Sequence, residues 1–242
     1  SLADRIALVG AALRAIRLLG GAGFDTLLGP VEDVTWWISG EGAGSVAGIE
    51  FDGFENLVGA ADNRDTFDFG PVGRISGIID GGPGGFDSLA IDANGNPVRT
   101  TANDPHSGVL SVGGNAIRYS GLEPIRITGA PDLHLGATSG DDVMTLTPSA
   151  TLGKFIFDAA MAEVIEFAIP SGSLTIDGLD GIDILTISGA LDFGAIPFTA
   201  LAESIVLDGS ITTSGAVALI AEATDASGFG PAETWAADVL VN

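Results

Sequence analysis

The chain has 242 residues, of which 46% are hydrophobic and 36 are glycine, so it can bury a large core and is dense in turns. Asp and Glu number 32 against 9 Lys and Arg, and the resulting charge of −23 argues against binding to a nucleic-acid backbone. There is no cysteine, which excludes a disulfide framework. The acidity fits solubility of a glycine-rich β protein, cation binding or a saline habitat.

Residues 2–19, LADRIALVGAALRAIRLL, predict an amphipathic helix that ends at the two glycines that follow. Arg14 and Arg17 interrupt the apolar residues, so the segment is too short and too charged to span a membrane. A signal peptide would carry its positive charges before the apolar residues, whereas here they lie chiefly after them. We expect residues 1–19 to be a capping helix over one end of the fold.

The stretch GGAGFDTLL at 20–28 matches G-G-x-G-x-D-x-U-x, the nonapeptide of calcium-binding parallel β-rolls. Related copies are GPGGFDSL at 82–89 and GLDGIDIL at 178–185. Their glycines suit turns that need a positive φ, which costs glycine little. The motif aspartates either bond to turn amides or donate oxygen to a metal, and they are Asp25, Asp87 and Asp183. Weaker copies place two more aspartates at this position, Asp65 and Asp142.

A second series has a glutamate followed two residues later by an aliphatic residue, at Glu55, Glu123, Glu163 and Glu203. The last three glutamates are evenly spaced, and a motif aspartate lies about midway between each glutamate and the next. A unit of about 20 residues, with short β-rich segments between Gly, Asp and Asn, is typical of a β-solenoid coil. We expect residues 20–242 to form this solenoid, with Asp and Gly repeating because each coil turns the same corner.

Residues 88–120 break the period and predict a hairpin-rich insertion. Asn94-Gly95 and Gly113-Gly114 are two-residue hairpin signals, each placed between segments of alternating polarity. We expect both hairpins to project from the solenoid, where they serve either recognition or structure alone.

Three segments carry a family resemblance: WWISGEGAGSVAGIEFDGFENLVGAADNRDTFDF, GRISGIIDGGPGGFDSLAID and YSGLEPI. Together they resemble modules of very large repetitive bacterial surface and secreted proteins, the calcium-binding-repeat (RTX-like) and filamentous-haemagglutinin-like adhesins. The resemblance covers residues 20–128 and, more loosely, the later repeats. It implies a parallel β-helix or β-roll, an extracellular or cell-surface location in bacteria, and an adhesive or scaffold role.

The calcium part of this resemblance rests on Asp25, Asp87 and Asp183, the candidate metal ligands. Only the first copy is complete, because Pro83 and Leu179 replace the second glycine in the other two. Calcium β-rolls run the nonapeptide in tandem, whereas these copies are isolated. Calcium takes roughly 6–8 oxygen ligands, more than one such turn offers. A plain turn role is therefore the alternative, and no other cofactor and no catalytic residue is predicted.

A carbohydrate-active enzyme is an alternative function, because parallel β-helices can carry catalytic carboxylates on one face. The available carboxylates are Asp141, Asp142, Asp177, Asp180 and Asp183, which are equally well explained as corner residues. His106 and His134 are the only histidines, and neither H-E-x-x-H nor G-x-S-x-G occurs. In the Trp36-Trp37 pair, one ring must face outward or into an adjoining element, which fits core packing or a sugar platform.

The sequence therefore predicts an all-β, right-handed parallel β-solenoid with an N-terminal capping helix. We expect a non-enzymatic structural or adhesive module that associates end to end with itself or with neighbouring repeats. Surface polysaccharide is a further expected partner, and neither nucleic acid nor membrane insertion is expected. The alternatives are a carbohydrate-active enzyme on the same fold and a module that folds when calcium binds.

Overall fold

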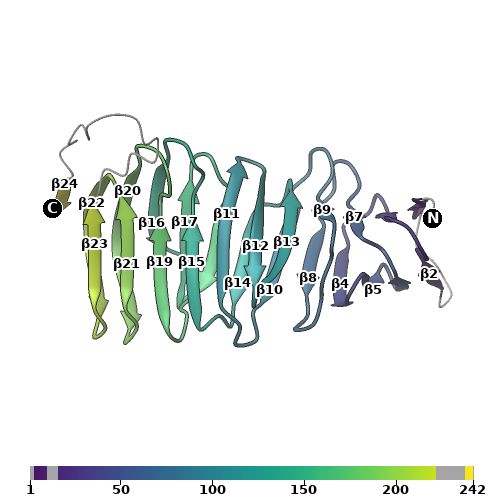
Figure 1. Cartoon of the computed structure of the whole chain (residues 1–242), viewed down its shortest axis with the longest axis horizontal. Coiled ribbons are helices and arrows are strands. Elements are labelled where there is room, and N and C mark those ends of the chain that lie inside the picture. The colour runs from purple at the N-terminus through teal and green to yellow at the C-terminus, as the bar shows by residue number, and fades with distance from the viewer. Residues whose placement is uncertain (1–2, 10–15, 222–237, 242) are drawn as a thin grey trace.

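The computed structural model describes residues 3–9, 16–221 and 238–241. Over these residues the chain is all-β, and its 24 strands form two large mixed sheets. Figure 1 shows the sheets as layers along one long axis, with the first strands at one end and the last strands at the other. None of the described residues belongs to a helix that is long and apolar enough to cross a membrane.

One sheet has 11 strands. In spatial order they are β1 (Arg5–Ala7), β3 (Thr26–Leu28), β7 (Asn56–Val58), β9 (Ile78–Asp80), β13 (Asn115–Ser120), β12 (Ser107–Val112), β11 (Val98–Asp104), β15 (Asp132–Gly136), β19 (Ser173–Asp177), β21 (Phe198–Ala202) and β23 (Val217–Ala221).

The other sheet has 13 strands. In spatial order they are β2 (Arg17–Leu19), β6 (Ile49–Asp52), β5 (Ala43–Val46), β4 (Thr35–Gly40), β8 (Thr66–Phe69), β10 (Ser88–Asp92), β14 (Ile125–Thr128), β18 (Ile165–Ala168), β17 (Lys154–Ala159), β16 (Val143–Pro148), β20 (Ile184–Gly194), β22 (Ser204–Thr213) and β24 (Asp238–Val241).

The chain alternates between the two sheets, except at three places where three consecutive strands stay in one sheet. These three are antiparallel meanders, β4–β5–β6, β11–β12–β13 and β16–β17–β18. The other pairings between described strands are parallel, such as β8 with β10 and β10 with β14. Parallel neighbours need a crossover between them, and the intervening strand in the opposite sheet supplies it.

The core lies between the sheets and is filled by alternate side chains of the strands. In β8, Phe67 and Phe69 are buried, whereas Asp68 between them is only partly buried. Trp36 of β4 is the register partner of Phe67, and the two rings stack with their centroids 5.2 Å apart. The next residue, Trp37, is 56% exposed, because neighbouring side chains of a strand point to opposite faces. The expectation that the two tryptophans face opposite ways is confirmed.

The N-terminal helix predicted for residues 1–19 is wrong in the part that the structure describes. Both described segments, β1 and β2, are strands, and residues 1–2 and 10–15 lie outside the described residues. β1 pairs with β3 and β2 pairs with β6, while Ile6 and Leu18 pack against the core. Backbone pairing with the ends of the two sheets outweighs the local helix preference, which is a weak and context-dependent signal.

The predicted hairpin at Gly113-Gly114 is confirmed. It joins β12 to β13, which pair antiparallel with Val112 opposite Asn115. Both glycines have positive φ, as the tight two-residue hairpin turn requires. The strands lie within the 11-stranded sheet and do not project from it, because β11 pairs with β15 and β13 pairs with β9.

The predicted hairpin at Asn94-Gly95 is wrong, although its local turn is present. The amide of Asn96 donates to the carbonyl of Ala93 at 2.9 Å, and Asn94 and Gly95 both have positive φ. The strands that it joins, β10 and β11, lie in different sheets. The turn is therefore a corner between the sheets, and the amide of Gly95 bonds to the next corner at the carbonyl of Gly129.

Candidate functional site

Several acidic residues of the two sequence series lie at equivalent corners, where the chain enters a strand. Asp25, Asp87 and Asp183 each directly precede a strand, as do Glu55 and Glu203. The strand register places some of these residues beside one another, since β3 pairs with β7 and β20 pairs with β22. Glu123 and Glu163 lie two residues before their strands, so the glutamate series shares this position only in part.

The side chains at this position bond the corners together. Each accepts the backbone N–H of the matching residue on the neighbouring strand, at distances of 2.6 to 3.0 Å. The donor and acceptor pairs are Asp4 to Asp25, Asp25 to Glu55, Val34 to Asp65, Asp65 to Asp87, Asp142 to Asp183, and Asp183 to Glu203. We call the six acceptors Asp25, Glu55, Asp65, Asp87, Asp183 and Glu203 the carboxylate ladder.

Asp142 departs from this pattern for a topological reason. A ladder carboxylate accepts an amide from the corner before a parallel neighbouring strand. On that side β16 has the antiparallel β17, so no matching corner amide is present there. Asp142 instead accepts two bonds from Thr138, from the amide at 2.9 Å and the hydroxyl at 2.7 Å. The carboxylate thus closes its own turn, while the backbone N–H of Asp142 donates to the carboxylate of Asp183.

Close packing against the ladder explains a glycine of the sequence motif. A Cβ on Gly178 would lie 2.2 Å from Oδ2 of Asp183 and 2.7 Å from its Cγ, so no side chain fits there. Gly85, the motif glycine two residues before Asp87, has a φ of 84°. A Cβ on Gly85 would also lie 2.1 Å from the carbonyl oxygen of Asn63. Corner geometry therefore dictates both glycines.

Burial changes the protonation of the ladder. Asp183 is fully buried, and desolvation raises its pKa to about 7, with further raising by the charges of Glu203 and Asp142. Desolvation raises the pKa of Asp87 to about 6, against the lowering effect of the hydrogen bond from the Asp65 amide. The pKa of Asp65 is raised as well, chiefly by burial. Part of the ladder therefore carries protons near neutral pH.

The three aspartates predicted to bind calcium do not share a site. Asp25 lies at a corner of the 11-stranded sheet, whereas Asp87 and Asp183 lie at separate corners of the other sheet. Oδ2 of Asp25 and Oδ2 of Asp183 are buried without a hydrogen-bond partner. However, the described residues contain no group of three or more acidic or histidine side chains arranged to hold a metal ion. One free oxygen per corner does not fit calcium, which takes roughly 6–8 oxygens.

Most of the carboxylates considered for an enzyme are engaged in corner contacts. Asp142 and Asp183 are buried in corners, and Oδ1 of Asp141 accepts the amide of Ile182 at 2.9 Å. Asp177 lies on β19 with its Oδ2 2.9 Å from Nε2 of His134, while Asp180 is exposed in the loop that follows. These residues therefore do not line one cleft.

Glu163, which belongs to the glutamate series, lies in a cluster that the sequence does not predict. It is 3% exposed, and desolvation raises its pKa to about 8, with additional raising by the charges of Glu123 and Asp104. Nδ1 of His106 lies 3.9 Å from Oε1 of Glu163. Burial of this carboxyl among like charges favours its protonated form.

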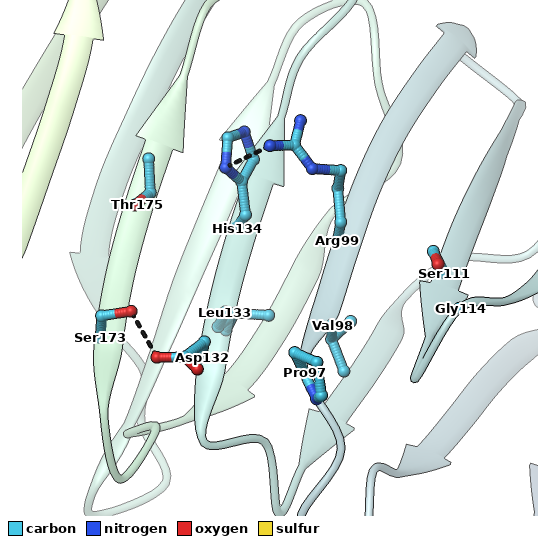
Figure 2. A pocket seen from close by; sticks show the side chains of 10 residues that line it. All are labelled: Pro97, Val98, Arg99, Ser111, Gly114, Asp132, Leu133, His134, Ser173 and Thr175. Atoms are coloured by element: carbon cyan, nitrogen blue, oxygen red, sulfur yellow. Dashed lines mark hydrogen bonds between the residues drawn. The ribbon is translucent and has the colours of Figure 1, made fainter.

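A polar site missed by the sequence analysis lies on the outer face of the 11-stranded sheet. Arg99 of β11 pairs in register with His134 of β15, and Nη2 of Arg99 lies 3.1 Å from Nδ1 of the histidine. Figure 2 shows these two side chains turned toward each other. Nε2 of His134 lies 2.9 Å from Oδ2 of Asp177. The hydrogen bond from His134 is the main cause that lowers the pKa of Asp177.

An open hollow of about 360 Å³ adjoins this pair. Residues of three parallel strands and the neighbouring meander line it, as Figure 2 shows, and they include Pro97, Ser111, Asp132, Ser173 and Thr175. The alternation of polar and apolar residues in each strand is enough to predict that these side chains point outward. Their grouping depends on which strands are neighbours, which the sequence alone does not reveal.

Comparison of the chain with protein-family models, with curated proteins and with solved structures finds no match. What the protein does must therefore be inferred from its own residues.

Proposed function

We propose that the chain is a non-enzymatic structural and adhesive module of a long bacterial extracellular or cell-surface protein. In this proposal it is a right-handed parallel β-solenoid in which each coil corresponds to one sequence repeat. The alternation of strands between two sheets and the parallel pairing outside the three meanders support the solenoid. The resemblance of residues 20–128 to large repetitive adhesins supports the location and the adhesive role.

The carboxylate ladder is the observation that carries the proposal. Six acidic side chains of the repeat bond one corner to the next, so the recurring part of each repeat is used for stacking. Such repetition lets a solenoid extend by adding coils, because each coil contacts only its neighbours. Asp141 and Asp183 accept backbone amides at the corners, which gives less support to the enzyme alternative.

The ends of the sheets are suited to continued stacking. Among the described strands, β1 and β23 are the edges of one sheet, and β2 and β24 are the edges of the other. The amide of Phe198 donates to the carbonyl of Ala216, so alternate residues of β23 face β21. The backbone groups of Val217 and Leu219 therefore point to the opposite side, where a further strand can pair.

The test is end-to-end association of the protein in solution. Val217→Pro removes an edge N–H and is tolerated on an edge strand, whereas Val217→Thr keeps both the N–H and the β-branched shape. We expect light scattering of the wild-type protein and of Val217→Thr to show growth in mass with concentration, and Val217→Pro to remain smaller. Monomers throughout a wide concentration range, or equal growth of both variants, would contradict assembly through this edge.

A further inference from the structure

The hollow on the outer face of the 11-stranded sheet has the size and the chemistry of a binding site. Its volume of about 360 Å³ falls within the range of roughly 300–1,000 Å³ that is usual for small-molecule sites. It contains Arg99 and His134 in a chain with only nine Lys and Arg and two His. One arginine and several hydrogen-bonding groups therefore lie together at one place on a strongly acidic protein.

The hydrogen bonds fix the orientation of Arg99. A guanidinium only donates, so Nδ1 of His134 accepts from Arg99, while Nε2 of His134 lies 2.9 Å from Oδ2 of Asp177. The contact with Asp177 orients the imidazole of His134, and the imidazole accepts one N–H of Arg99. Arg99 is an exposed residue, so its other guanidinium donors can meet a planar anion from solution.

The remaining lining of the hollow suits hydroxyl groups. The hydroxyl of Ser173 donates to Oδ1 of Asp132 at 2.7 Å, as Figure 2 shows, and this carboxylate has further acceptor positions. Thr175 and Ser111 add side-chain hydroxyls, and the exposed ring of Pro97 adds an apolar surface. Donors, acceptors and an apolar patch together match the hydroxyls and C–H groups of a sugar ring.

We propose that this hollow binds a sugar that carries a carboxylate, such as a uronic acid unit of an acidic glycan. The carboxylate pairs with Arg99, and the ring hydroxyls bond to Asp132 and to the serine and threonine hydroxyls. The overall charge of −23 repels an acidic polymer, so recognition is confined to the few units that reach the arginine. This inference rests on the proposed adhesive function and gives it a ligand class.

The experiment is calorimetric titration of the whole chain with a galacturonic acid trisaccharide and, separately, with its methyl ester. Arg99→Gln removes the proposed carboxylate partner. Arg118→Gln is the matched control, because Arg118 is exposed on β13 of the same sheet and lies outside the hollow. Thermal melting of both variants shows whether they retain the fold.

We expect the acid to bind at least tenfold more tightly than its ester. Arg99→Gln should weaken binding of the acid at least tenfold, while Arg118→Gln should change it less than twofold. Equal binding of acid and ester, no binding of the acid, or equal effects of the two variants would overturn the proposal. Inorganic phosphate is titrated as well, because guanidinium also matches phosphate, and tighter binding of phosphate than of the trisaccharide would exclude the sugar.

The two proposals fail in different ways. Absence of trisaccharide binding by a protein that still grows in mass with concentration refutes the sugar site alone. Binding of the trisaccharide by a protein that stays monomeric at every concentration refutes the assembly alone.

Discussion

Replacing Asp183 by asparagine should change how the stability of the protein depends on pH. The side chain is fully buried, and its Oδ1 accepts the amide of Asp142 at 2.8 Å. Asparagine keeps a carbonyl oxygen for this bond and has almost the same shape, but it cannot ionise. Asp183→Asn therefore isolates the contribution of ionisation from those of packing and hydrogen bonding.

The sign follows from the raised pKa of Asp183, about 7 against an ordinary value of 3.8. The folded protein holds this proton more strongly than the unfolded chain does. Its stabilising effect is complete below about pH 4, declines as the pH rises, and is gone above about pH 7. A difference of about three pKa units corresponds to about 4 kcal/mol, and relaxation around the ionised group makes about 2–4 kcal/mol the expected loss.

The assay is urea unfolding of wild-type protein and variants at a series of pH values from about 4 to 8. We expect Asp183→Asn to match the wild type within about 1 kcal/mol at pH 4 and to exceed it by about 2–4 kcal/mol at pH 8. Asp180→Asn is the control, because it removes the same charge from an exposed position nearby.

Two results would refute this reasoning. Parallel stability curves for Asp183→Asn and the wild type would mean that burial does not retain the proton. Lower stability of Asp183→Asn at pH 8 would mean that the ionised carboxylate stabilises the corner. If Asp180→Asn weakened the pH dependence of the free energy of unfolding as much as Asp183→Asn, the net charge of the protein would explain that dependence.

Two further predictions concern the corners. Gly178→Ala should lower the free energy of unfolding by about 2 kcal/mol or more, since its Cβ would lie 2.2 Å from Asp183 Oδ2. Gly140→Ala, whose Cβ would come no closer than 3.7 Å to the nearest atom, should be nearly neutral, and equal losses in urea melts would contradict the packing argument. Thermal melting in chelator and in millimolar calcium should differ by less than about 4 °C, because the ladder carboxylates already bond to backbone amides. Unfolding in chelator would instead establish the calcium-triggered alternative.

The spacing of Asp and Glu residues in the sequence pointed to the ladder without revealing its bonds. In the sequence, Asp183 and Glu203 belong to different series, because a glycine motif precedes Asp183 but not Glu203. In the structure both precede strands, and Glu203 accepts the amide of Asp183 at 2.6 Å. The carboxylate of either Asp or Glu can accept the backbone N–H at a corner, so the same hydrogen bond forms with either residue.

The outer site could not be predicted in the same way. Arg99, His134 and Thr175 are far apart in the sequence, and they share no motif. They meet because β11, β15 and β19 pair in parallel register. The meander β11–β12–β13 also shapes the hollow, and the turn that leads into it, at Asn94-Gly95, was predicted to be a hairpin within one sheet.

By itself, the sequence determined the all-β class, the approximate positions of many strands, and the corners marked by glycine and acidic residues. These properties depend on local polarity, backbone freedom and short-range turn chemistry, which neighbouring residues encode. Tertiary structure decided that β1 and β2 are strands, which strands became neighbours, and which carboxyl groups were buried enough to retain protons. These properties depend on contacts between residues that are distant in the chain, and the local pattern does not contain them.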